Sequence, residues 1–393
     1  MKVLQTISGL SAKSGGPSTC TLDLMNGLCD INANVELLTA SSPDILGKGS
    51  KWLREVPNDY KTPLGFSFNI RGALKESDYD VYHANAIWGY SSHATCKIAR
   101  EKGKPYILSP HGMLYPTALA IKRWKKIPML KLWFNKDIMQ ATCLHATCQQ
   151  EADYCRQFGY NGPIAIIPNA VVFPDFLKET QSDFRLKDSS GTKKSIGFLG
   201  RLHPIKKVEN VLYALDHLKR HESNLNIAEN ISFQIMGKYD DTYEQRLKDE
   251  VKRLQLDDCV EFVGFVNGKE KYERLSRLSA LMVPSAQENF GMIVPEALIC
   301  GTPVYASLGT PWNELNTCNC GWWKDNAPET IAEVIKEILN TPEQHLATMG
   351  ANGRKLMEEK YEQHKVAAMM LRLYEWVNNG CKEEGRPEFV VTD

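Results

Sequence analysis

This 393-residue chain has no excess of charge of either sign and no long apolar run. It carries 47 basic and 47 acidic side chains, whereas a protein that binds nucleic acid in bulk needs a basic excess, so no nucleic-acid partner is expected. No stretch reaches the length of a membrane span. The apolar part of the N-terminus is too short and too broken for a signal peptide, and we expect a cytoplasmic protein.

Spaced cysteine pairs are also missing, although eleven cysteines are present. Cys143, Cys148 and Cys155 lie near His145 without a Cys-x-x-Cys spacing, and Cys318-x-Cys320 is too tight for one tetrahedral site. An odd, scattered set of cysteines suits a reducing compartment and buried thiols. We therefore expect no metal and no cofactor.

Short apolar runs alternate with helical patterns along the whole chain, which predicts an α/β protein with parallel sheets. The length is too great for one core, so two domains are expected. Strands are predicted near 3–7, 35–39, 81–83, 106–109, 144–147 and 164–167, and again near 195–201, 231–236, 260–263, 281–284 and 304–306. A polar, charged stretch from Phe173 to Lys194 between the two series reads as a linker.

The last strong helical pattern covers Glu362 to Asn378, where apolar residues recur with the spacing of an amphipathic helix. The tail after Gly380 is polar, and we expect it to be loose. No internal repeat is visible.

Two acids, Glu288 and Glu296, stand where a buried strand, Ala280 to Val283, gives way to a loop and then to a helix. Pro295 suits the first turn of that helix, and Gly301 suits its end. The backbone N–H groups of the helix start could hold an anion. The alternative is a helix N-terminus that carries acids because they favour its dipole.

Three further motifs follow predicted strands. Gly200-Arg-Leu-His-Pro-Ile-Lys-Lys207 offers Arg201 and Lys206 to a diphosphate, or is a solvated basic loop. Ser14-Gly-Gly-Pro-Ser18 places Gly15 and Gly16 where backbone can approach a substrate, or is a plain turn. It lacks the Gly-x-Gly-x-x-Gly of a nicotinamide dehydrogenase, which disfavours that class. His111, in Ser109-Pro-His-Gly, lies at the end of a strand and is either functional or structural.

Together these motifs resemble the retaining enzymes of glycosyltransferase family 4, over the chain from Lys2 to about Val377. The resemblance implies the GT-B fold, two tandem Rossmann-like domains whose parallel sheets face each other across a cleft. The acceptor-side domain would cover 1–175, with a helix at 364–380 packing back onto it. The nucleotide-sugar-binding domain would cover 190–362.

The resemblance also implies roles for individual residues. His111 and Glu288 would be catalytic and contact the donor sugar, Glu296 would hold the ribose, and Arg201 and Lys206 the diphosphate. The expected donor-binding residues are Gly15, Gly16, Arg201, Lys206, Asn289, Phe290, Gly291, Met292 and Glu296. Lys207 stands where the family usually has glycine, and register favours Lys206 as the phosphate ligand.

Asp78-Tyr-Asp80 looks like the metal-binding Asp-x-Asp of the other glycosyltransferase fold, but it precedes a strand instead of following one. An exposed strand start is the better interpretation, and we expect a metal-independent enzyme.

The stretch 117–137 combines six basic residues with Trp124, Trp133 and Phe134. Such mixtures lie on anionic membranes, although two ordinary surface helices split at Pro128 would give the same pattern. The stretch from His111 through Trp133, with His145-Ala-Thr147 and Ile167-Pro-Asn-Ala170, looks like the bacterial capsule, lipopolysaccharide and exopolysaccharide branch of family 4.

We therefore expect a hexosyltransferase-type enzyme (EC 2.4) that moves a sugar from a nucleotide-diphosphate sugar to a hydroxyl of a surface glycan, which a lipid carrier would hold. A GT-B nucleotide-sugar epimerase, a sugar phosphorylase and a non-catalytic sugar-nucleotide-binding subunit are the alternatives.

Overall fold

The computed structural model describes residues 1–393 except 12–15, 60–64, 179–192, 223–224, 239 and 393. It divides into two compact units, each built on its own sheet. Unit 1 is Met1–Val172 with Tyr361–Asp393, and unit 2 is Phe173–Lys360. Much of the stretch read as a linker, 179–192, lies outside the described residues.

Unit 1 contains an eight-stranded sheet in the order β14-β7-β6-β5-β4-β1-β2-β3. All neighbours pair in parallel except β14 and β7. The strands are β1 (Val3–Thr6), β2 (Val35–Ala40), β3 (Leu53–Val56), β4 (Val81–Asn85), β5 (Tyr106–Ser109), β6 (Cys143–Ala146), β7 (Ile164–Ile166) and β14 (Val390–Val391).

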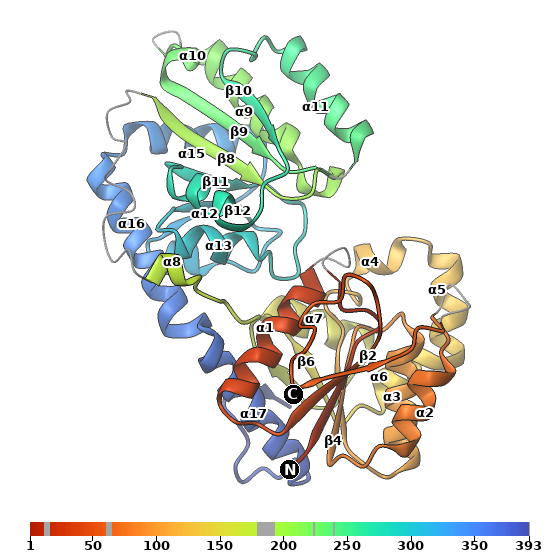
Figure 1. The fold of residues 1–393 in the computed structure, drawn as a ribbon. Coiled ribbons are helices and arrows are strands. Elements are labelled where there is room, and N and C mark those ends of the chain that lie inside the picture. The colour runs from red at the N-terminus through yellow and green to blue at the C-terminus, as the bar shows by residue number, and fades with distance from the viewer. Residues whose placement is uncertain (12–15, 60–64, 179–192, 223–224, 239, 393) are drawn as a thin grey trace. The chain divides into compact units, whose positions relative to one another are not determined.

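Helices cover both faces of this sheet, because alternate strand residues are apolar on both sides. Val3 and Val81 face α1 and α17, whereas Leu4 and Tyr82 face α2, α3 and α6. Figure 1 shows α1 and α17 together on one side and α2 and α3 on the other. The helices are α1 (Gly16–Asp30), α2 (Phe68–Glu76), α3 (Tyr90–Glu101), α4 (Pro116–Ala120), α5 (Arg123–Met129), α6 (Asn135–Met139), α7 (Gln149–Phe158) and α17 (Gln363–Asn378).

Unit 2 contains a six-stranded parallel sheet in the order β10-β9-β8-β11-β12-β13. The strands are β8 (Lys194–Leu199), β9 (Ile231–Met236), β10 (Val260–Gly264), β11 (Ala280–Val283), β12 (Val304–Ser307) and β13 (Gly321–Lys324). The helices are α8 (Asp175–Lys178), α9 (Val208–His221), α10 (Ile227–Asn230), α11 (Asp241–Arg253), α12 (Gly268–Ser276), α13 (Ile293–Ile299), α14 (Glu314–Thr317), α15 (Pro328–Asn340) and α16 (Glu343–Leu356). Helices α9, α11 and α15 form the main core with one face of the sheet.

The α/β architecture with parallel sheets is confirmed, and two details of the prediction are wrong. The tail after Gly380 is not loose, because Val390 is buried and Val390–Val391 pair with the edge strand β7. The surface helices in 117–137 do not split at Pro128, which lies inside α5. The break is at Ile121 and Lys122, where Lys122 takes a left-handed conformation (φ 52°) that ends α4. A π-helical turn, Leu130–Phe134, then joins α5 to α6.

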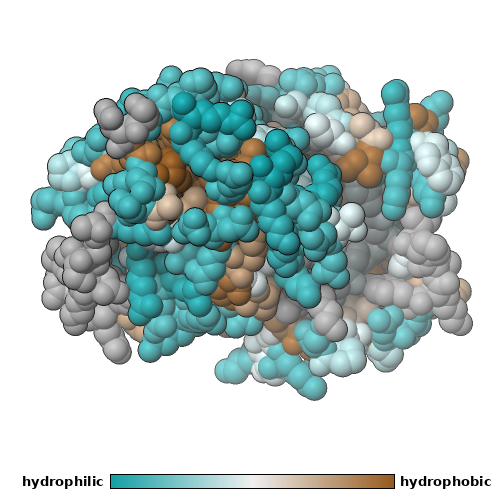
Figure 2. Space-filling model, turned by 90° about the horizontal axis from the view of Figure 1, so that it is seen from above, coloured by the Kyte–Doolittle hydropathy of each residue, from teal (hydrophilic) through white to brown (hydrophobic). Residues whose placement is uncertain are grey.

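The surface drawn in Figure 2 is mostly hydrophilic and shows hydrophobic residues only in patches. No helix in the described part of the chain is long and apolar enough to cross a membrane.

Candidate active site

The sheet of unit 2 reverses its direction of growth between β8 and β11. The chain adds β9 and β10 on one side of β8, and then returns to add β11, β12 and β13 on the other. Ligands of open α/β sheets bind at such a switch point, outside the carboxyl ends of the strands. The loops that follow β8 and β11 carry Lys206 and Glu288, so topology brings two of the predicted residues to this place.

Lys206 and Glu288 form an ion pair across the switch point. The Lys206 ammonium contacts Glu288 Oε1, and the Ser285 hydroxyl donates to the same oxygen at 2.7 Å. Their side chains are only 18% and 13% exposed, so this charge-assisted contact is partly shielded from water. The amide of Ala286 also donates to the Ile205 carbonyl at 2.8 Å and ties the two loops together. Two residues expected to contact diphosphate and sugar therefore contact each other.

A buried tryptophan shapes the loop that carries Glu288. The Trp312 indole N–H donates to the Phe290 carbonyl at 2.5 Å, and the two rings pack edge to face with centroids 5.0 Å apart. The Phe290 side chain is buried in this contact, so its ring supports the loop and offers no surface to a ligand. Gly309 packs directly against the backbone of Ala286, and a Cβ added to Gly309 would lie 2.2 Å from the Ala286 carbonyl oxygen.

The second acid of the pair has a different partner. Glu296 stands in the first turn of α13, and its Oε1 lies 2.9 Å from Lys271 Nζ on α12. Lys271 was not predicted from the sequence, because one lysine in a charged helix carries no signal of its own. Glu288 and Glu296 therefore belong to two separate ion pairs.

The other predicted residues of unit 2 lie around the same loops. Gly291 takes a positive φ of 78°, and the N–H groups of Gly291, Met292 and Ile293 make no hydrogen bond within the described residues. Asn289 belongs to the same loop as Glu288. Arg201 is exposed directly after β8 and Gly200.

In unit 1, His111 lies in a tight turn after β5. His111 and Gly112 both have positive φ, 51° and 75°, and the buried Glu151 carboxylate accepts from Gly112 N at 2.5 Å and from Thr147 N at 2.8 Å. The His111 ring contacts Asn85 at the end of β4, with Nε2 3.1 Å from Oδ1. Burial of the ring, followed by the nearby His145, lowers the pKa of His111 to about 3. His111 is therefore neutral at pH 7.

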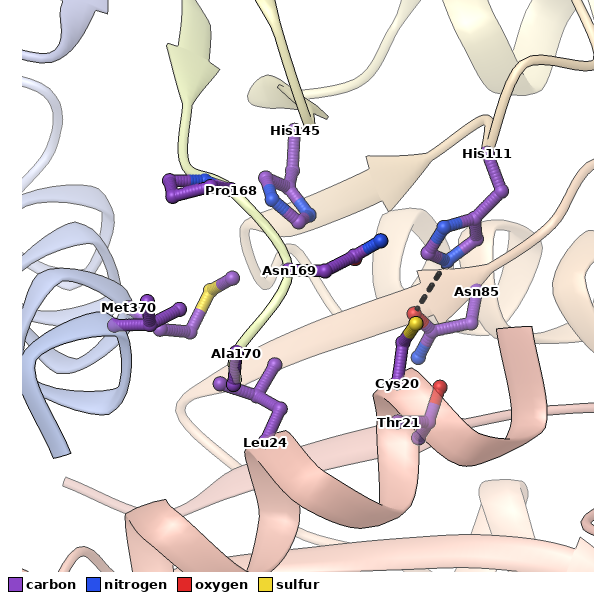
Figure 3. Close-up of a pocket in the computed structure, with 11 residues that line it drawn as sticks. Cys20, Thr21, Leu24, Asn85, His111, His145, Pro168, Asn169, Ala170 and Met370 are labelled. Carbon is purple, nitrogen blue, oxygen red and sulfur yellow. Dashed lines mark hydrogen bonds between the residues drawn. The ribbon is translucent and has the colours of Figure 1, made fainter. Parts of the chain in front are cut away.

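Figure 3 shows the small cavity that His111 lines, with Asn85 and His145 beside it and Asn169 reaching in from the segment after β7. Helices α1 and α17 complete the walls through residues such as Cys20 and Met370. Its volume is about 20 Å³, enough for roughly one water molecule. Gly16 is the exposed first residue of α1, whereas Gly15 lies outside the described residues.

Metal ligands are not grouped anywhere in the part of the chain that the structure describes: no three His, Cys, Asp or Glu side chains could share an ion. Asp78 is 93% exposed at the start of β4, where it lies 3.9 Å from Lys104, as expected of an exposed strand start.

The comparison with protein families covers both units. Residues 14–172 match the model described as Glycosyltransferase Family 4, and residues 179–356 match Glycosyl transferases group 1. A D-inositol 3-phosphate glycosyltransferase of Streptomyces bingchenggensis is 31% identical over 75% of this chain and 70% of its own length. A GDP-mannose-dependent alpha-(1-6)-phosphatidylinositol dimannoside mannosyltransferase of Mycobacterium tuberculosis is 32% identical, but the match spans only 22% of this chain and 23% of that protein.

Among solved structures, the Anabaena protein Alr3699/HepE in complex with UDP superimposes with a TM-score of 0.72 at 18% identity. The match covers 95% of this chain and all of the other, and it establishes the GT-B fold. Both family models and the Streptomyces relative agree with it. This chain therefore belongs to glycosyltransferase family 4, and it is a glycosyltransferase with the GT-B fold.

Proposed function

We propose that this enzyme transfers a sugar, with retention of configuration, from a nucleotide-diphosphate sugar to a hydroxyl of a lipid-linked surface glycan. The observation that carries the proposal is the Lys206–Glu288 ion pair at the switch point of unit 2. A cation and a carboxylate that neutralise each other in the free protein can part when a donor enters. Lys206 then takes a diphosphate oxygen, and Glu288 takes a sugar hydroxyl.

Each remaining residue has a place in this proposal. Arg201 and the free N–H groups at Gly291 and Met292 stabilise the leaving diphosphate. Glu296 leaves Lys271 to hold the ribose hydroxyls. Neutral His111 positions the sugar.

The proposed reaction needs no second carboxylate. Retaining hydrolases use two carboxyl groups roughly 5 Å apart. In this proposal Glu288 binds a sugar hydroxyl instead of attacking the anomeric carbon, and the reaction follows a same-face mechanism. The bond between the anomeric carbon and the phosphate oxygen breaks, the acceptor oxygen bonds to the same carbon, and the leaving phosphate takes the acceptor's proton.

A thermal-shift screen with UDP-, GDP-, ADP- and dTDP-sugars tests the donor. The named relatives bind UDP or depend on GDP-mannose, so both nucleotides belong in the screen. A donor at a hundred times its Kd should stabilise the protein by about 2.7 kcal/mol. If none of the four raises the melting temperature, the proposed donor class is wrong.

Three variants then test the residue roles. Lys206→Ala should abolish the shift with the free nucleoside diphosphate. Glu288→Ala should keep that shift, because Lys206 is released, yet lose sugar transfer. Lys207→Ala is the matched control, because its ammonium lies 3.8 Å from Glu209 and not at Glu288. A shift lost with Lys207→Ala and kept with Lys206→Ala would contradict the assignment.

The products of the same enzyme preparation separate the alternatives. A transferase labels a lipid extract with radioactive sugar. A phosphorylase would pass the sugar to inorganic phosphate, an epimerase would alter the donor without an acceptor, and a non-catalytic subunit would bind without turnover.

We further propose that the segment 117–137 contacts the cytoplasmic face of an anionic membrane and so brings the enzyme to its lipid-linked acceptor. Its side chains combine exposed apolar groups, such as Trp124 at 73% and Leu132 at 68%, with the exposed cations Lys125 and Lys131. Aromatic residues interleaved with lysines suit the interface of an anionic bilayer.

Sedimentation with vesicles of phosphatidylglycerol and phosphatidylcholine tests this contact. Reversing Lys125 and Lys131 to Glu should release the protein, at about 1 kcal/mol per charge lost from the surface. Lys126 is left intact, because its ammonium donates to the Ala118 carbonyl at 2.5 Å. Reversal of the exposed Lys48 and Lys51 is the control, and equal effects of both pairs would refute a specific contact.

A further inference from the structure

Beneath the His111 cavity, a buried hydrogen-bond chain joins the C-terminal helix to the catalytic histidine predicted from the sequence. Its inner members come from β1, β4, β5, β6 and α17 and are each between 0% and 5% exposed: Gln5, His83, Asn85, Ser109, His145 and Tyr374. Its two ends are the Ile167 carbonyl and the His111 ring. Because its inner members are shielded from water, each of their protons has to be shared within the chain.

The proton positions can be assigned from the Ile167 end, where the acceptor is unambiguous. The His145 Nε2 lies 2.9 Å from the Ile167 carbonyl oxygen, so it must carry the proton. Burial lowers the pKa of His145 to about 4, and the ring is neutral at pH 7. His145 Nδ1 therefore accepts, and its donor is the Ser109 hydroxyl at 2.7 Å.

The proton positions can be assigned in the same way as far as Tyr374 on α17. With its proton given to His145, Ser109 must accept from His83 Nε2 at 2.7 Å. Burial, followed by His145 and His111, lowers the pKa of His83 far below its usual value, so His83 is also neutral. His83 Nδ1 then accepts from the Tyr374 hydroxyl at 2.8 Å.

From Tyr374 the chain turns back toward the cavity. The Tyr374 oxygen accepts from Gln5 Nε2 at 2.8 Å, which turns Gln5 Oε1 toward Asn85 Nδ2 at 3.0 Å. A second, longer contact runs from Asn85 Nδ2 to the Thr6 carbonyl at 3.3 Å and is made in the same orientation of the amide. Asn85 Oδ1 is thus the atom presented to His111 Nε2, and it can only accept.

We propose that Gln5 and Tyr374 are positioning residues that, through Asn85, keep His111 as the Nε2–H tautomer, so that His111 Nδ1 accepts a hydrogen bond from a hydroxyl of the donor sugar. In Figure 3 that second nitrogen lies on the side of the ring that faces Asn169. A neutral ring with a lone pair there repels phosphate oxygens and suits a hydroxyl donor. The hydroxyl part of the inference rests on the proposed function, whereas the tautomer does not.

Nitrogen NMR of the free enzyme, labelled in its histidine rings, tests the tautomer without any substrate. In the wild type, His111, assigned by comparison with His111→Gln, should show a protonated Nε2 and an unprotonated Nδ1. Tyr374→Phe removes only the hydroxyl oxygen, so Gln5 loses its fixed orientation. The two His111 nitrogen resonances should then move toward each other as the tautomers mix. Gln5→Leu removes the side-chain amide itself and should give the same change in the His111 nitrogen resonances.

Tyr160→Phe is the matched control. Tyr160 is equally buried in the same unit and donates to the Ala141 carbonyl at 3.0 Å, outside the chain. It should lose comparable stability and leave the His111 resonances in place. A protonated Nδ1 in wild-type His111, or unchanged His111 resonances in both Tyr374→Phe and Gln5→Leu, would overturn the proposal. Failure of every sugar nucleotide to bind would overturn the proposed function and leave these spectra unaffected.

Discussion

Mild acid should loosen the sheet of unit 1, because buried neutral histidines sit at its centre. His83 on β4 and His145 on β6 are buried, and burial lowers the pKa of both. As the pH falls, a histidine whose pKa is lowered by folding becomes protonated in the unfolded chain before it does in the folded protein. The contribution of these histidines to the free energy of unfolding is therefore fully present above the unfolded pKa of 6.5. It declines as the pH falls toward the pKa of the folded state.

His145 alone sets a useful magnitude. With a folded pKa of about 4 and an unfolded pKa of 6.5, moving from pH 8 to pH 5 costs about 2 kcal/mol. That free energy corresponds to an increase of about thirtyfold in the equilibrium constant for opening of the structure. His83 and His111 act with the same sign. His364 acts in the opposite sense, because Glu362 and Asp30 raise its pKa, but it lies on the surface, where water screens the effect.

Hydrogen exchange measured by mass spectrometry gives the assay. Peptides that cover β4 and β6 should lose at least thirtyfold protection between pH 8 and pH 5, after correction for the chemical exchange rate. Peptides of β8 and β9, which carry no histidine, serve as the reference and should change less. Unchanged or greater protection of β4 and β6 at pH 5 would refute the assignment of neutral histidines.

Three substitutions and one control substitution test the packing. Lys207→Gly should raise the free energy of unfolding in urea by about 1 kcal/mol, since Lys207 holds a left-handed φ of 52°; a lower free energy of unfolding would contradict this strain. Gly309→Ala should destabilise the protein, because the new Cβ meets the Ala286 carbonyl. The control, Gly72→Ala, lies in open space on α2 and should stabilise the protein by about 0.5–1 kcal/mol. Equal melting temperatures of the two variants would count against the close approach. Val390→Ala should cost about 2 kcal/mol in urea unfolding if the tail is packed as described, and close to nothing if it is loose.

The parts of the fold that could be predicted are those whose signal is local. The strand Tyr106–Ser109 is buried throughout and mainly apolar, and Ile231–Met236 alternates buried apolar residues with partly exposed polar ones in its first half. The boundaries of both strands agree with the prediction. Strands β3, with the sequence Leu-Arg-Glu-Val, and β13, with Gly-Trp-Trp-Lys, were missed, because edge strands are partly exposed and tolerate polar residues. The strand β14 is only two residues long and owes its existence to the free edge of β7.

The residues of the candidate site also divide into those that a local motif predicts and those whose contacts only the structure reveals. Glu288, Lys206 and His111 are predicted site residues because each lies in a short motif after a strand, and strand ends are where α/β proteins bind ligands. That Lys206 contacts Glu288, 82 residues away, was not visible in either motif. Lys271 and the supporting role of Trp312 were missed, because neither has a local pattern that marks it.

The amino-acid sequence alone was enough to predict the α/β class and most of the strands, and it carries the motifs of family 4. Those properties follow from periodicity and from short strings, which are contiguous in the chain. Only the tertiary structure decided which cation neutralises Glu288, which lysine holds Glu296, and that Tyr374 is linked to His111 through Gln5, from the opposite end of the chain. Such pairings depend on through-space distances of about 3 Å between residues up to 369 positions apart, and no local pattern records them.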